Sequence, residues 1–201
     1  MYIPEIYKNE NQEEIHQFLH ENGFAILVNQ TNGKLWATHI PLYFEPENNL
    51  LHGHLSIENP QSIDFKNDDE VLVIFQGNHT YISSSWYDHE NVPTWNYIAV
   101  HVYGKIKILS HDETILHLKK LVDKYEANQE KPVKIENLSR KTMLQFRGIL
   151  GFEIHINSIE AKKKLSQNRD DKNYQSIITH LEKSTDFQAK AIASEMKKSR
   201  K

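Results

Sequence analysis

The chain has 201 residues, of which 38% are hydrophobic and 25% charged, and its formal net charge at pH 7 is −3. This balance is typical of a globular protein and excludes a disordered chain. The absence of cysteine excludes disulfides and thiolate metal sites. No apolar run approaches the roughly 20 residues of a membrane span, and the N-terminus lacks the apolar region of a signal peptide. We therefore expect a cytoplasmic protein that does not bind membranes.

The charge is unevenly distributed along the chain. Residues 161–201 contain 11 Lys and Arg against 5 Asp and Glu, whereas residues 1–160 contain 13 against 22. We predict two domains, an acidic body over 1–160 and a basic helical appendage over 161–201. Such an appendage can pack on the body or on a partner subunit, hold an anionic ligand, contact nucleic acid, or form a solvated helical face.

The chain begins with a predicted helix and a predicted hairpin. The helix starts after Asn11, with an acidic residue at its third position as in a capping box, and stops at Gly23. Two β-prone runs, 24–30 and 35–44, then flank the turn pair Asn32-Gly33. Both turn residues tolerate the positive φ angles that a tight hairpin needs, so the pair is a strong hairpin signal.

Further strands are predicted in the middle of the chain. Residues 50–55 are a predicted strand after a polar turn, and 71–77 are an apolar run predicted to form a buried strand. The run 95–109 alternates with a period of two, with apolar residues on one face and aromatic, then charged, residues on the other. A last alternating run covers 151–159, where Glu153 falls on the polar side.

Helices are predicted between and after these strands. Ser110 and Glu113 form a capping box that begins a helix extending to Tyr125. Residues 128–137 are a connecting loop, and 138–147 favour a short helix.

The C-terminal part is polar and helical. Residues 162–169 form a polar stretch, and 174–181 place apolar residues at the spacing of an amphipathic helix. A final helix begins at Asp186. Hairpins that precede helices predict an α+β fold, an antiparallel β-barrel with flanking helices and a C-terminal helical appendage.

Twelve histidines raise the question of a metal site. His52 and His54 form an H-x-H pair, which points both rings to one face of a strand. His39 and His101 also lie on predicted strands. No HExxH helix is present, and no carboxylate occurs at a familiar ligand spacing. We therefore predict no metal site and interpret these histidines as polar pocket walls, with a structural metal or haem site as the alternative.

No catalytic residue is predicted either. The sequence lacks the glycine patterns of Rossmann and P-loop phosphate sites and the G-x-S-x-G elbow of serine hydrolases. The adjacent serines 83–85 have no positioned base nearby in the sequence.

Two segments have the composition of a ligand site. Trp and Tyr are dense between residues 81 and 103, and aromatic walls with a few polar groups suit a flat heterocycle, a dimer interface or core packing. The basic run at 162–169 combines cationic and amide donors that can hold a phosphate or carboxylate. A run of lysines is, however, usually solvated.

Eight segments in collinear order carry a family resemblance over nearly the whole chain. They resemble the PaiB-like family of FMN-binding negative transcriptional regulators, and VPTWNY…VHVYG is the most specific block. The segments are MYIP (Met1–Pro4), WATHIPL (Trp36–Leu42), LHGHLSIENPQ (Leu51–Gln61), VLVIFQG (Val71–Gly77), YISSSWY (Tyr81–Tyr87), VPTWNYIAVHVYGK (Val92–Lys105), GFEI (Gly151–Ile154) and KLSQNR (Lys164–Arg169).

The resemblance implies the split barrel of the pyridoxamine-phosphate-oxidase-like group, in which two chains form a homodimer and bind FMN between the subunits. It also implies a set of cofactor-binding residues by position. These are Thr38, His39, Ile40, Pro41 and Leu42 beside the isoalloxazine ring, His54, Leu55 and Asn59 near the phosphate, Trp86, Trp95 and Asn96 closing the site, and Lys164, Gln167 and Arg169 as a C-terminal contact.

The resemblance favours a non-enzymatic regulator, for example of sporulation or degradative-enzyme genes. The helices after Asp171, with their basic end, are the face that can contact DNA. The competing class is an enzyme, either a flavin-dependent oxidoreductase or a haem-handling split barrel, because a flavin supplies the redox chemistry itself. A third alternative is a barrel that has lost its cofactor and serves as an interaction module.

Overall fold

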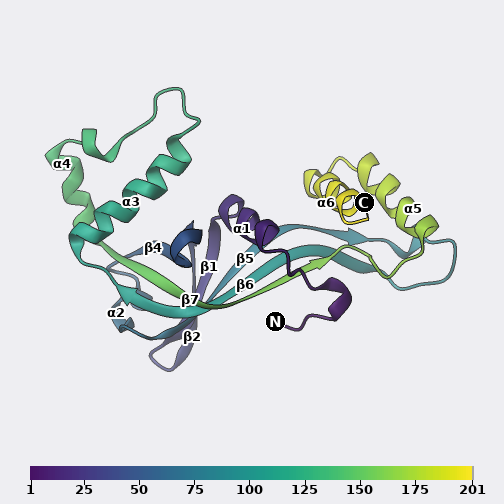
Figure 1. Cartoon of the computed structure of the whole chain (residues 1–201), viewed down its shortest axis with the longest axis horizontal. Coiled ribbons are helices and arrows are strands. Elements are labelled where there is room, and N and C mark those ends of the chain that lie inside the picture. The colour runs from purple at the N-terminus through teal and green to yellow at the C-terminus, as the bar shows by residue number, and fades with distance from the viewer. Residues whose placement is uncertain (201) are drawn as a thin grey trace. The chain divides into compact units, whose positions relative to one another are not determined.

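The computed structural model describes residues 1–200 (Figure 1). One seven-stranded sheet has the order β2-β1-β5-β6-β7-β4-β3, and the pairs β1–β2, β1–β5, β3–β4 and β4–β7 are antiparallel. The strands are β1 (Phe24–Thr31), β2 (Lys34–Pro41), β3 (Tyr43–Glu45), β4 (Leu50–Ser56), β5 (Glu70–Ile82), β6 (Thr94–Ile108) and β7 (Ile149–Lys164). The helices are α1 (Gln12–Glu21), α2 (Pro60–Asp64), α3 (His111–Glu126), α4 (Arg140–Met143), α5 (Asp171–Lys183) and α6 (Phe187–Lys198), joined by short 3-10 helices such as η3 (Ser84–Trp86).

The chain divides into two compact units. Unit 1 consists of Met1–Ile15, Gln76–Val100 and Glu160–Lys201, and unit 2 of His16–Phe75 and His101–Ile159. The unit boundaries fall inside β5, β6 and β7, so each of these strands contributes residues to both units. The predicted domains, 1–160 and 161–201, stay a prediction that a truncated chain would test.

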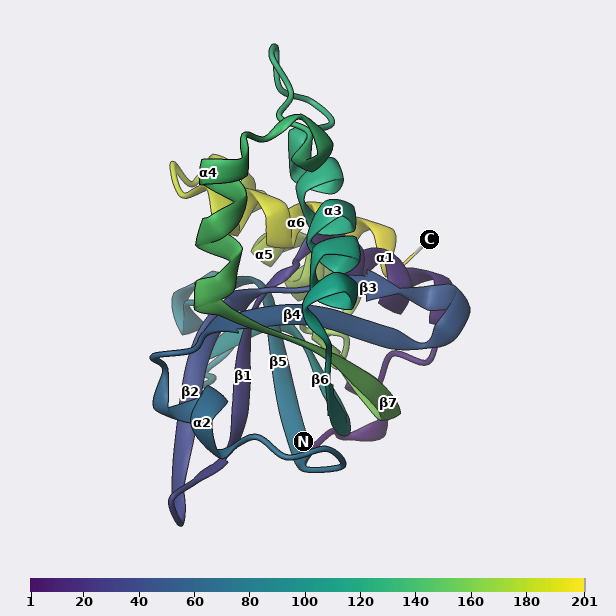
Figure 2. The ribbon, with the colours of Figure 1, turned by 90° about the vertical axis from the view of Figure 1, so that its left-hand side faces the viewer.

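Unit 2 contains the predicted hairpin and most of the barrel. Asn32 and Gly33 have φ angles of 50° and 72°, and β1 and β2 pair over their full length. The helix α3 packs on β4 (Figure 2). It begins at the predicted capping box, in which Ser110 Oγ accepts from the Glu113 N–H and the Glu113 carboxylate accepts from the Ser110 N–H. The largest fully buried side chains of this unit are Leu19, Leu27, Leu42, Leu51, Phe75, Ile106, Phe152 and Ile154.

The predicted single strand over 35–44 is wrong in one respect, because the chain forms two strands there. β2 pairs with β1, whereas β3 pairs with β4. Pro41 has no N–H to donate to a ladder, and the Leu42 N–H donates instead to the Gly23 carbonyl at 2.7 Å. The Leu42 side chain is buried, so the chain turns a corner of the barrel at this residue.

Unit 1 contains the two C-terminal helices, which pack against each other. Both begin at an aspartate N-cap, Asp170 for α5 and Asp186 for α6. The apolar stripe predicted for α5 is confirmed as buried, together with one face of α6. The buried residues are Tyr174, Ile177, Ile178, Leu181, Ala189, Ile192, Ala193 and Met196.

The basic run that follows 161 is only partly a polar stretch, because β7 continues to Lys164. The Lys162 side chain is buried, and its ammonium lies 5.2 Å from the ring centroid of Tyr97 and donates to the Tyr2 carbonyl at 3.2 Å. Lys163 pairs with two carboxylates. Long lysine stems bury readily when the charged end finds aromatic faces or carbonyls. The solvated-face interpretation is therefore wrong for this part of the run.

Candidate functional site

The residues expected beside a flavin ring, Thr38–Leu42, lie at the end of β2 and in the corner after it. β2 is the terminal strand in the sheet order, and within residues 1–200 it pairs only with β1. Its outer edge therefore presents backbone N–H and C=O groups without a strand partner. The Ile40 side chain is buried and the Leu42 N–H is bonded to Gly23, so this edge ends at Pro41.

Asn59, expected near a phosphate, is held against the same strand. Its Nδ2 donates to Thr38 Oγ1 at 3.1 Å, and its Oδ1 accepts from the Gln61 N–H at 3.0 Å. Both ends of the amide are engaged, so Asn59 fixes Thr38 relative to α2. His39 is exposed, and its ring centroid lies 6.3 Å from that of Phe24.

His54 and Leu55 are adjacent but differ in surroundings. Leu55 is buried in the core, opposite Leu150 of β7. His54 lines a small cavity in unit 2, and burial lowers the pKa of its imidazole. The H-x-H pair shares this cavity, as the strand geometry predicted. The lining residues are His52, Gly53, His54, Thr114, His117, Leu118 and Leu121.

His52 is only 2% exposed and has a carboxylate partner. Its Nε2 lies 2.6 Å from Glu45 Oε2, and Glu45 Oε1 accepts from Lys120 at 2.8 Å. The hydrogen bond from Lys120, reinforced by His52, lowers the pKa of Glu45 to about 2, while burial lowers the pKa of His52. Near neutral pH the ionised carboxylate of Glu45 therefore faces the neutral imidazole of His52. Since a carboxylate only accepts, the Nε2 of His52 carries the proton.

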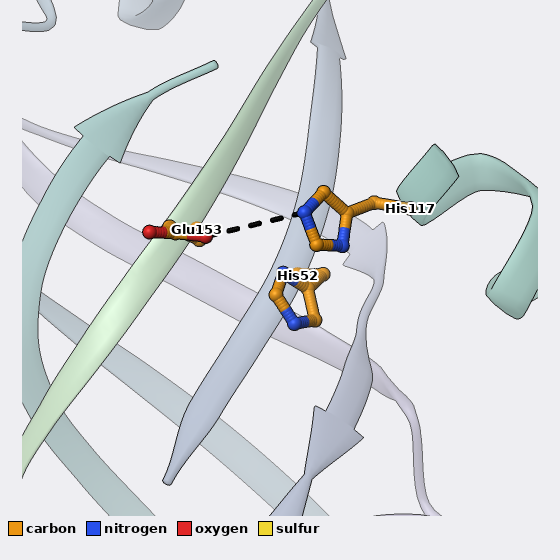
Figure 3. A group of neighbouring side chains, drawn as sticks. All are labelled: His52, His117 and Glu153. Carbon is orange, nitrogen blue, oxygen red and sulfur yellow. Dashed lines mark ion pairs between the residues drawn. The ribbon is translucent and has the colours of Figure 1, made fainter. Parts of the chain in front are cut away.

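His117 and Glu153 complete a cluster around His52 (Figure 3). The rings of His52 and His117 stack with centroids 3.8 Å apart. Glu153 Oε1 accepts from Lys107 at 3.0 Å and from His155 at 2.9 Å, while Oε2 lies 4.0 Å from His117 Nε2. Burial opposes ionisation of Glu153, but the bonds from Lys107 and His155 outweigh it and lower its pKa. Burial lowers the pKa of His117 as well.

In unit 1 the predicted aromatic residues are of two kinds. Trp95 on β6 is 52% exposed, and its ring centroid lies 6.0 Å from that of His79 and 6.1 Å from that of Tyr81. Trp86 instead stacks on His180 of α5, with centroids 5.0 Å apart and planes at 9°. The group formed by Trp95, His79 and Tyr81 is thus accessible to a ligand, whereas the Trp86 ring packs against α5.

The three predicted C-terminal contacts lie at the end of β7 and in the turn after it. The Lys164 ammonium donates to the Trp95 carbonyl at 2.8 Å, and burial lowers its pKa. The amide of Gln167 bonds backbone groups of its own turn at both ends. The Arg169 guanidinium lies 4.7 Å above the Tyr87 ring.

Asn96 is fully buried rather than presented to a ligand. Its Oδ1 accepts from Ser166 Oγ at 3.0 Å, and its Nδ2 lies 3.6 Å from the sulfur of Met196. It therefore joins β6, the turn after β7 and α6. Its predicted contact with a cofactor stays a prediction, as do those of Trp86, Gln167 and Arg169.

The structure thus brings together Thr38 with Asn59 in unit 2 and Trp95 with Lys164 in unit 1. Sequence reasoning missed His117 and the carboxylates at 45 and 153. Only the H-x-H pair in the sequence pointed to this cluster, because His117 lies on α3 and the two glutamates lie on β3 and β7.

Comparisons with known proteins agree with this architecture. The family described as “Putative FMN-binding domain” matches residues 1–158. The “Protease synthase and sporulation protein PAI 2” of Bacillus subtilis is 44% identical over 196 residues, which are 96% of this chain and 95% of that protein. The solved FAD and haem binding protein of Mycobacterium smegmatis has a TM-score of 0.65 at 14% identity, over 85% of this chain and 79% of that one. The flavocytochrome Anf3 of Azotobacter vinelandii has a TM-score of 0.61 at 14% identity, over 84% and 75%.

The fold is therefore an α+β split β-barrel with flanking helices and a C-terminal helical pair, as the sequence predicted. The match over residues 1–158 and the 44% identity identify the chain as a member of the FMN-binding-domain family and, within it, of the PaiB-like proteins. No helix within residues 1–200 combines the length and apolarity needed to cross a bilayer.

Proposed function

We propose that the chain is a PaiB-like negative transcriptional regulator that binds FMN as a homodimer. The observation that carries the proposal is the 44% identity to the Bacillus subtilis sporulation protein over 96% of the chain. Similarity over nearly the full length of both proteins supports a common role. The FMN-binding description of the matched family supports the cofactor. No residue is assigned a catalytic role.

The outer edge of β2 supports a flavin site in unit 2. An isoalloxazine ring carries a row of carbonyl oxygens and ring nitrogens along one edge, and unpaired backbone groups at Thr38–Pro41 complement such a row. The bond from Asn59 to Thr38 holds this edge in place, which limits the entropy lost on binding.

Unit 1, taken by itself, also contains a group of side chains that suits a flat aromatic ring and a phosphate. Trp95, with Tyr81 and His79 beside it, offers an exposed aromatic surface. Lys164 provides a positive charge next to it. A charge-assisted bond from an ammonium to a phosphate is stronger than a neutral one.

Exposed apolar side chains on the β1–β2 hairpin support a homodimer. Leu35 is 83% exposed, and Phe24 and Trp36 are also exposed. A large contiguous apolar patch at a surface marks a protein interaction site, and we propose that these side chains contribute to such a patch. We expect L35E to weaken self-association, whereas L116E, at an exposed leucine on α3, leaves it intact. Light scattering that shows a monomer of the wild type, with and without FMN, would refute the dimer.

Titration of the purified full chain with FMN tests the cofactor. We expect quenching of flavin fluorescence with saturation and a rise in melting temperature. K164A should weaken binding roughly tenfold to a hundredfold, the value of a hydrogen bond to a charged group. K190A, at an exposed lysine of the same unit, is the matched control. A folded protein that shows neither quenching nor a thermal shift in excess FMN lacks the cofactor, whereas equal affinity of K164A would refute only the assigned site.

Selection from a random duplex pool tests the regulatory role. Deleting α6 would remove buried residues of unit 1, so charge removal at Lys197 and Lys198 is the better probe of the basic end. We expect enrichment of a sequence motif by the wild type and weaker retention by the doubly substituted chain. Absence of any enrichment, with and without FMN, argues against direct DNA binding. FMN-dependent oxidation of NADPH by the same sample would favour the oxidoreductase alternative.

A further inference from the structure

Three side chains that are distant in the sequence converge inside unit 2. His52 comes from β4, His117 from α3 and Glu153 from β7 (Figure 3). One ligand atom of each lies within 4.8 Å of the other two. The proposed flavin edge does not include His117 or Glu153, so the cluster requires its own explanation.

One ring nitrogen of the buried His52 imidazole has no hydrogen-bond partner among the residues that the structure describes. Its Nε2 lies 2.6 Å from Oε2 of Glu45, and an Nε2 that donates to this oxygen leaves the lone pair of the neutral ring on Nδ1. That atom is buried and has no hydrogen-bond partner within the described chain. Leaving a buried acceptor unsatisfied is costly. A carboxylate on the far nitrogen is also the arrangement that orients histidines in metal sites.

The other two groups also keep a coordinating atom available. Glu153 uses Oε1 for Lys107 and His155, and its Oε2 faces His117 Nε2 at 4.0 Å. The His117 ring lies almost parallel to that of His52, at 16°. Its Nδ1, which is not the nitrogen that faces Glu153, is buried and likewise has no partner among residues 1–200. The atoms that the two groups keep available to an ion are therefore His117 Nε2 and Glu153 Oε2.

We propose that His52, His117 and Glu153 form a site for one divalent transition-metal ion of the Zn²⁺ class. Two imidazoles and one carboxylate are a ligand set used for zinc and for non-haem iron. Bonds of about 2.0–2.2 Å place tetrahedral ligand atoms roughly 3.3 Å apart, so the 4.0 Å pair must close by less than about 1 Å. The stacked rings of His52 and His117 must also turn out of their parallel arrangement, because the lone pair of each imidazole nitrogen lies in the plane of its ring.

The neighbouring cavity gives the ion a fourth position. Its wall includes Gly53, His54 and Thr114, none of which is one of the three ligands. A site with three protein ligands and one open position admits water or a small anion. Charged partners already hold the ligand groups in position, since Lys120 binds Glu45, which contacts His52, and Lys107 binds Glu153.

Titration of the chelator-treated full chain with Co²⁺, and with Zn²⁺ in competition with a chromophoric chelator, tests the proposal. We expect one ion per chain, visible absorption typical of four-coordinate Co²⁺, and a rise in melting temperature with Zn²⁺. X-ray absorption of the Zn²⁺-loaded wild type should show two imidazoles and oxygen donors. Folded wild type without stoichiometric binding, or zinc with other than two imidazoles, would overturn the proposal.

Variants locate the ion. H117N and E153Q should each weaken binding at least tenfold. E45Q, which removes the negative charge that contacts His52 Nε2, should weaken it tenfold to a hundredfold. H111A, at an exposed histidine of the same helix, should leave the affinity unchanged. Circular dichroism confirms that each variant is folded. Wild-type affinity in both H117N and E153Q would show that the ion binds elsewhere and would refute the site.

Discussion

The contact between Gly151 of β7 and Thr114 of α3 determines how closely the helix lies on the sheet. A Cβ added to Gly151 would lie 2.7 Å from the Cβ of Thr114 and closer still to its hydroxyl. Thr114 is buried, and its hydroxyl donates to the Ser110 carbonyl at 2.8 Å. The threonine cannot rotate away without losing that bond, so G151A must push α3 outward.

The cost of G151A is the difference between two effects. Overpacking a well-packed site costs about 1–3 kcal/mol. Alanine also reduces the entropy of the unfolded chain, a gain of about 0.4–1 kcal/mol that applies because the φ of Gly151 is not positive. We expect a net loss of between about 0 and 2.6 kcal/mol. In a chain of this size that lowers the melting temperature by up to about 10 °C.

A double-mutant cycle measured by urea unfolding tests this reasoning. In a T114G background no side chain meets the new methyl group, so G151A should be neutral or slightly stabilising. The coupling energy should therefore be about 1–3 kcal/mol. If G151A costs the same in both backgrounds, the clash is not with Thr114 and the argument fails.

Three further predictions concern stability. S110A removes the cap of α3 and should lower the unfolding free energy by about 1 kcal/mol in urea titration; an unchanged midpoint would contradict the capping role. I177A empties a fully buried position of α5 and should cost about 2–5 kcal/mol by the same assay, and a smaller loss would mean that the helix pair collapses onto the gap. Burial opposes ionisation of Glu195, but Lys198 and Lys163 outweigh it and lower the pKa of this carboxyl group. The contribution of Glu195 to the free energy of unfolding is therefore present above about pH 4.5 and is lost as the pH falls below that value. E195Q should flatten the dependence of the urea midpoint on pH between 5 and 3, and an unchanged slope would refute this.

Features decided within a few residues were predictable from the sequence. The Asn32-Gly33 turn, the Ser110 capping box and the stripe of α5 depend on local backbone preferences and on spacing along one element. The alternation of β6 is also confirmed, since its apolar positions from Ile98 to Ile106 are buried.

Features decided by partners far along the chain were not predictable. The break at Leu42 depends on the carbonyl of Gly23, and the burial of Glu153 depends on α3, which covers the polar side of β7. The candidate metal cluster was not predictable either, because its residues lie on one helix and two strands and no sequence spacing relates them. The candidate flavin-binding residues were assigned only through family resemblance. Among them, Asn96 is buried and contacts Ser166 and Met196, which no sequence pattern indicated.

The discontinuity of unit 1 has a consequence for synthesis on the ribosome. The amino group of Met1 pairs with Glu160, and the Asn9 N–H donates to the Ala161 carbonyl, so the first segment binds the last. At about 5–20 residues per second, roughly 145 residues must be added before these partners exist, a delay of about 7–30 s. During that interval the nascent N-terminus has no native partner from 160–201. A premature stop before residue 160 would thus release a chain whose leading segment lacks these two contacts, and we expect chaperones and proteases to bind such chains.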